Sequence, residues 1–95
     1  MHYIFDIIDK TGRKIHLSEE RWKHILEHKG MEHRLDDIKR TLIEPTIITL
    51  HRHDKNRRNY YFYYKEIQRH LLVAVKYLNG KGYVTTSFIV RNIKK

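Results

Sequence analysis

The stretch that decides the fold runs from Leu71 to Arg91 and reads LLVAVKYL-NGKG-YVTTSFIVR. Val, Ile, Tyr, Phe and Thr dominate it, and these residue types favour β-strands. The central NGKG contains an asparagine and two glycines, which tolerate the positive φ angles that tight hairpin turns require. The stretch therefore predicts two long antiparallel strands joined by a turn.

The register of this hairpin decides which side chains face solvent. Pairing Leu78 with Tyr83 across a four-residue loop places Thr86 on a mostly apolar face. The opposite, solvent-facing side then carries one cation and two hydroxyls: Lys76, Thr85 and Ser87. That composition suits a binding or catalytic site, although a sheet face that is simply solvated would have the same composition. A β-bulge or the opposite choice of core face would expose Thr86 instead, and otherwise this threonine is structural, so all three hydroxyl residues remain candidates.

The composition describes a small basic domain spanning residues 1–95. Twenty Lys and Arg against 11 Asp and Glu give a net charge of +9, which favours a polyanion, with nucleic acid ahead of an anionic membrane or an acidic protein. The absence of cysteine excludes disulfides and thiol nucleophiles. No apolar run approaches the roughly 20 residues of a membrane span, and the first residues lack signal-peptide features, so we expect a cytoplasmic protein.

The remaining sequence predicts a hairpin, two helices and further strands. In chain order, we expect a hairpin over residues 2–17, a helix from Ser18 to Gly30, a helix over 32–44, and strands over 46–53 and 60–67. Ser18 is a favoured N-cap, and Pro45 stops the second helix. Helices segregated from strands indicate an α+β fold, in which the short hairpin and both helices pack on a four-stranded antiparallel sheet.

Two histidines, His24 and His28, are four residues apart on the first predicted helix and would share one face of it. A metal site would need a third ligand, and the chain has no HExxH motif, so we expect no metal. The other interpretations are a solvated pair or a general acid–base pair, for which imidazole is suited by its near-neutral pKa.

The run Tyr60–Tyr64 carries aromatic rings on both faces of a predicted strand. One set would join the core, whereas the other could stack unpaired bases or serve as an amphipathic cover. Basic residues adjoin these rings and could hold phosphates. The candidate nucleic-acid-binding residues are Arg21, Arg57, Arg58, Tyr61, Tyr63 and Arg91.

The segments DKTGRKIHLSEERWKHILEH (9–28) and LVAVKYLNGKGYVTTSF (72–88) resemble a phage-associated family of the BECR group. That group takes in barnase, EndoU, colicin E5/D and RelE-like nucleases. Together with the helix before Pro45, the resemblance covers nearly the whole chain. It implies helices on a four-stranded antiparallel sheet and metal-independent ribonuclease action, often as a toxin or a module of a mobile element. It also implies catalytic roles for His24 on the helix and Thr86 on the last strand.

We therefore expect a metal-independent, cofactor-free endoribonuclease that cleaves RNA by attack of the ribose 2′-hydroxyl. The candidate catalytic residues are His24, His28, Lys76, Thr85, Thr86 and Ser87. Lys76 or Arg58 would hold the scissile phosphate. The alternative is a catalytically silent module of the same fold that binds nucleic acid or an acidic protein. Expected partners are RNA, an acidic antitoxin or inhibitor protein, and a second copy of the chain paired through a strand edge.

Overall fold

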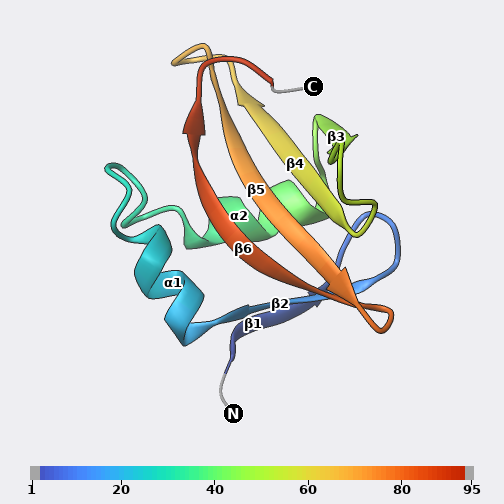
Figure 1. Cartoon of the computed structure of the whole chain (residues 1–95). Helices are drawn as coiled ribbons and strands as arrows, with labels where there is room; N and C mark the ends of the chain where they lie inside the picture. The colour runs from blue at the N-terminus through green and yellow to red at the C-terminus, as the bar shows by residue number, and fades with distance from the viewer. Residues whose placement is uncertain (1–2, 94–95) are drawn as a thin grey trace.

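The computed structural model describes residues 3–93, so His2 of the predicted hairpin lies outside the described residues. The elements are β1 (Tyr3–Ile8), β2 (Lys14–Ser18), α1 (Glu19–Ile25), α2 (Leu35–Ile43), β3 (Ile47–Leu50), β4 (Arg57–Tyr64), β5 (Arg69–Leu78) and β6 (Lys81–Val90). Helix α2 crosses one face of the sheet, and α1 lies beside β6 (Figure 1). The predicted α+β class is confirmed.

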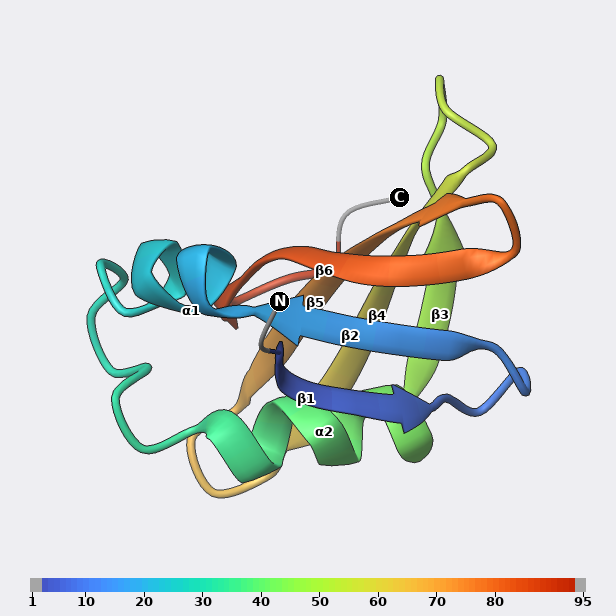
Figure 2. The same ribbon diagram turned by 90° about the horizontal axis from the view of Figure 1, so that it is seen from below.

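The sheet has six strands in the order β1-β2-β6-β5-β4-β3, so the predicted four-stranded antiparallel sheet is wrong. Strand β2 pairs with β6 in parallel, through Ile15 with Gly82 and His16 with Tyr83, and thereby joins the N-terminal hairpin to the other strands (Figure 2). Ile15 and Leu17 of β2 are fully buried, which requires that the hairpin lie against the core. A parallel pair needs a long crossover connection, and the chain from α1 to β5 provides it.

The β5–β6 hairpin closes with a two-residue turn, so the predicted four-residue loop is wrong. Leu78 pairs with Lys81, and the turn residues Asn79 and Gly80 have φ angles of 54° and 80°. An Asn-Gly turn of this kind matches the twist of the strands that it joins. The next glycine, Gly82, serves packing instead, because a Cβ there would lie 2.9 Å from Cε1 of Tyr77.

An irregularity in β6 reverses the faces predicted for its second half. Ala74 pairs with Thr86 while Val75 pairs with Val84, so Thr85 is an extra residue without an opposite partner. A one-residue insertion moves every later side chain to the other face. Ser87 is consequently fully buried and donates a hydrogen bond to the carbonyl of Leu72 at 2.7 Å. The predictions that Ser87 faces solvent and that Thr86 faces the core are both wrong.

The first helix begins as predicted and ends early. The Ser18 hydroxyl accepts a hydrogen bond from the backbone N–H of Arg21 at 3.2 Å, which confirms the N-cap. The helix ends at Ile25, well before Gly30, because the N–H groups of Glu27 and His28 bond three residues back instead of four. The second helix is also shorter than predicted, at Leu35–Ile43.

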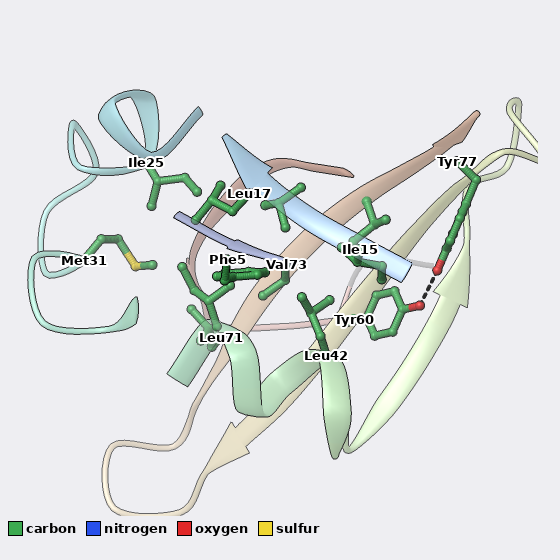
Figure 3. Close-up of a cluster of buried hydrophobic side chains, with 13 residues drawn as sticks. Phe5, Ile15, Leu17, Ile25, Met31, Leu42, Tyr60, Leu71, Val73 and Tyr77 are labelled. Atoms are coloured by element: carbon green, nitrogen blue, oxygen red, sulfur yellow. Dashed lines mark hydrogen bonds between the residues drawn. The ribbon is translucent and has the colours of Figure 1, made fainter. Parts of the chain in front are cut away.

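The core lies between α2 and the sheet (Figure 3). Its buried apolar side chains are Phe5, Ile15, Leu17, Ile25, Met31, Ile38, Leu42, Tyr60, Leu71, Val73, Val75, Tyr77 and Val84. One carboxylate, Asp9, is only 5% exposed at the margin of this cluster. The hydroxyls of Tyr60 and Tyr77 hydrogen-bond to each other and to Asp9 Oδ2, so the buried charge has partners.

Candidate active site

The face of the sheet opposite α2, which we call the open face, is defined row by row by the strand register. Its rows are His16, Tyr83, Lys76 and Arg57; then Thr86, Ala74 and Asn59; then Phe88, Leu72 and Tyr61; and finally Val90, His70 and Tyr63. Paired residues share a face, so each row lies side by side across three or four strands. The first row is cationic and aromatic, the second small and polar, and the third apolar.

His28 is placed over the open face by the turn that follows α1. Its Nε2 atom lies 3.5 Å from Thr86 Oγ1, and its ring centroid lies 5.1 Å from that of Phe88. The bulge at Thr85 makes this contact possible, because without it both Thr86 and Phe88 would point into the core. An imidazole therefore lies beside a hydroxyl at the surface of the sheet, where both are accessible to a ligand.

His24 has different surroundings. Its Nδ1 lies 3.8 Å from Glu27 Oε2, and its side chain is 57% exposed. Because α1 ends at Ile25, His28 is not one helical turn further along, and the predicted i,i+4 pair does not form. Of the two candidate histidines, His28 is the one that contacts the open face.

Lys76 and Arg57 are neighbours in the first row of the open face and share one counter-ion. Asp54 Oδ2 lies 3.6 Å from Lys76 Nζ and 3.4 Å from Arg57 Nε. A hydrogen bond from the Asn56 backbone N–H, followed by the charges of Lys76 and Arg57, lowers the pKa of Asp54 below its ordinary value. An ionised carboxylate thus lies between two cations, in the way that a phosphate would.

Sequence reasoning missed Asp54 because it stands in a polar loop that reads as solvated. The pairing register of β4 with β5 would have indicated Asp54, because it pairs Arg57 with Lys76 and Arg57 directly follows that loop.

The remaining candidates are divided between the two faces. Thr85 lies at the bulge and donates to the Ala74 carbonyl at 3.2 Å. Arg58 belongs to the opposite face from Lys76, with its guanidinium carbon 5.2 Å from the Tyr77 ring centroid. The two alternatives for holding the scissile phosphate, Lys76 and Arg58, therefore lie on opposite faces of the sheet.

The predicted stacking residues also differ. Tyr61 is fully buried, so its ring offers no surface to a base, whereas Tyr63 on the same face is 40% exposed. Arg21 on α1 and Arg91 after β6 are exposed, and no ion pair involves them in the part of the chain that the structure describes.

Within residues 3–93, no three His, Asp or Glu side chains gather in a way that could hold a metal ion. The same residues contain no helix with the length and apolar character of a membrane span.

Comparison with known proteins places the chain in a family. Among curated proteins and among solved structures, none matches it. A family model described as phage-Barnase-EndoU-ColicinE5/D-RelE like nuclease2 matches residues 6–95, which is nearly the whole chain and includes α1, the turn that carries His28 and all of β6. This match confirms the resemblance seen in the sequence. The protein therefore belongs to the phage-Barnase-EndoU-ColicinE5/D-RelE like nuclease2 family.

Proposed function

We propose that this protein is a metal-independent endoribonuclease whose acid–base group is His28. The observation that carries the proposal is the 3.5 Å contact between His28 Nε2 and Thr86 Oγ1 on a basic sheet face. Membership of a nuclease family supports cleavage of nucleic acid in general. The choice of RNA is ours and follows from the chemistry that these side chains can perform.

RNA carries its own nucleophile, so its cleavage needs few protein groups. A neutral imidazole at His28 would accept the proton of the ribose 2′-hydroxyl. The 2′-oxygen then forms a bond to phosphorus, the bond from phosphorus to O5′ breaks, and O5′ takes up a proton from a water molecule. The products are a 2′,3′-cyclic phosphate and a 5′-hydroxyl. DNA lacks the 2′-hydroxyl and cannot follow this route.

Lys76 is the cation placed to hold the scissile phosphate. It lies two residues along β5 from Ala74, the partner of Thr86, which is about 7 Å at the usual rise of a strand. The ammonium group would offset the charge that develops on the phosphate oxygens, and the Thr86 hydroxyl would donate to one of them. A phosphate bound here would displace Asp54, which holds Lys76 and Arg57 in the free protein.

This assignment replaces His24 by His28 as the acid–base residue, on the basis of position. The His24 ring lies beside Glu27 and is largely exposed to solvent. A substrate bound on the open face would therefore contact His28 before His24. His24 also provides a matched control, because it is the same residue type on the same short segment.

We also propose that the protein acts in the cytoplasm as a toxin or mobile-element effector. Its net charge of +9 would allow an acidic antitoxin to compete with RNA for the open face. Impaired growth on expression, relieved by His28→Ala, is the expected sign of such a role.

The test is incubation of the purified protein with labelled total RNA, with and without EDTA, beside His28→Ala and His24→Ala. We expect cleavage that persists in EDTA, falls by about 10²–10⁴-fold in His28→Ala, and is retained in His24→Ala. The products should carry 2′,3′-cyclic phosphate ends, and DNA of the same sequence should stay intact.

Other outcomes would direct the assignment elsewhere. Loss of cleavage in His24→Ala, with full activity in His28→Ala, would return the acid–base role to His24. Cleavage abolished by EDTA would refute the metal-independent route. Intact RNA that is nevertheless bound in a salt-sensitive manner would identify the catalytically silent binding module.

A further inference from the structure

Three aromatic rings form a stack on the open face beside the site already described. Tyr3 of β1 and His16 of β2 have ring centroids 4.0 Å apart and planes inclined by 20°. His16 and Tyr83 of β6 follow at 6.1 Å and 26°. The rings come from three adjacent strands and are nearly parallel, so they form one ladder across the sheet.

The ladder has an accessible end. Tyr3 is 41% exposed, whereas His16 and Tyr83 are partly buried between their neighbours. Tyr3 does not belong to the hydrophobic core. The outermost ring of an aromatic stack that is left to water presents a flat apolar surface, and a planar ligand can extend the stack there.

Burial lowers the pKa of His16, and the nearby charge of Lys81 lowers it further, against an opposing effect of Asp6. The imidazole is therefore neutral at pH 7, so its stacking with the tyrosine rings is not a cation–π contact. No hydrogen bond or ion pair of its side chain is found within residues 3–93, so the ring contacts with the two tyrosines are its defined interactions there.

The ladder continues directly into the cations of the first row. Tyr83 pairs with His16 on one side and with Lys76 on the other, and Lys76 pairs with Arg57. A stack of aromatic rings with cations at one end suits a single-stranded nucleic acid, which offers unpaired bases for stacking and phosphates for the cations. An apolar protein segment would not use the cations, and a double helix would not expose its bases.

We propose that Tyr3, His16 and Tyr83 form a stacking subsite for one unpaired base of an RNA strand that runs along this row toward a phosphate at Lys76. Tyr3 and Lys76 are three strand spacings of about 4.8 Å apart, so the stacked base and that phosphate belong to different nucleotides of the strand. The subsite rests on the proposed function, because it assigns one nucleotide of the strand whose scissile phosphate lies at Lys76. It makes single-stranded RNA the substrate class, because a paired base is not free to stack on Tyr3.

The experiment measures the binding of a fluorescent single-stranded oligoribonucleotide that is fully 2′-O-methylated. Methylation blocks the nucleophile, so binding is measured on the intact protein without cleavage. Tyr3→Ala should bind about 5- to 150-fold more weakly, while Tyr3→Phe, which keeps the ring, should bind like the wild type. Circular dichroism of each variant checks that the fold is retained.

A scan of single abasic nucleotides through the same oligonucleotide locates the stacked base. At one position the abasic change should weaken binding to the wild type and to Tyr3→Phe but not to Tyr3→Ala, because the variant has already lost the contact. Equal losses in all three proteins at every position would refute the subsite. If the protein shows this result but cleaves ordinary RNA, only the subsite is refuted and the proposed function stands. If the protein neither cleaves nor binds RNA, the proposed function and the subsite are both refuted.

Discussion

Replacing Tyr60 by phenylalanine should destabilise the protein through its effect on Asp9. The Tyr60 hydroxyl donates to Asp9 Oδ2 in a region where both side chains are buried. Asp9 also accepts from the backbone N–H and hydroxyl of Thr11, at 3.0 and 2.8 Å, and from the backbone N–H of Arg13 at 2.9 Å. Burial alone would raise the pKa of Asp9, but these hydrogen bonds together with those of Tyr60 and Tyr77 outweigh it and lower the pKa.

The magnitude follows from the number of donors that remain. A hydrogen bond to a charged group contributes about 1.5–3 kcal/mol. Asp9 keeps the donors on Thr11, Arg13 and Tyr77. We therefore expect the free energy of unfolding to fall by an amount near the lower end of this range, about 2 kcal/mol. In a domain of this size such a loss lowers Tm by about 8–16 °C.

Thermal unfolding followed by circular dichroism measures this change, with Tyr63→Phe as the control. Tyr63 lies on the same strand and is 40% exposed, so its variant should stay within about 0.5 kcal/mol of the wild type. The lowered pKa of Asp9 means that its contribution is present above the ordinary value of 3.8 and is lost as pH falls through the folded-state pKa. The difference between wild type and Tyr60→Phe should therefore shrink in strong acid. Equal Tm values for Tyr60→Phe and Tyr63→Phe would refute the role given to this hydrogen bond.

Three further changes test other parts of the structure. Gly82→Ala should destabilise by about 1–3 kcal/mol in urea unfolding, because the new Cβ would lie 2.9 Å from the Tyr77 ring; unchanged stability would show that the ring moves freely. Leu42→Ala should cost about 2–5 kcal/mol by the same measurement, since Leu42 is fully buried, and a smaller loss would mean that α2 packs loosely. Asp54→Asn should strengthen RNA binding and steepen its salt dependence in fluorescence anisotropy, because Lys76 loses its counter-ion, and weaker binding would contradict that account.

Local sequence signals predicted the parts of this protein that depend on neighbouring residues. The Ser18 cap, the turn at Asn79 and Gly80 and the α+β class all follow from residue preferences that act within a few positions. The family resemblance in two long segments was also readable from the sequence, as was the basic charge that favours a polyanion. None of these signals depends on which face of a strand is buried.

The candidate site depends on which face of β6 is buried. The alternation of apolar and polar residues along the sequence does not decide this. Thr85, Thr86 and Ser87 are three successive small hydroxyl residues, and any of them could have been the extra one. The structure makes Thr85 the bulge, because Val84 and Ser87 can then both face the core while Thr86 faces outward. The identity of the exposed hydroxyl was therefore decided by packing.

The position of His28 was likewise decided by tertiary structure. The sequence pattern continues the helix to Gly30 and makes His24 and His28 equivalent, but the helix ends at Ile25, which is fully buried. The turn that follows brings His28 to Thr86, a residue 58 positions further along the chain. Sequence by itself determined the order of helices and strands, the Ser18 cap and the basic net charge, since these arise from local preferences and composition. Tertiary structure decided which histidine meets which hydroxyl, because that contact requires the bulge in β6, the parallel pairing of β2 with β6 and the end of α1 at once.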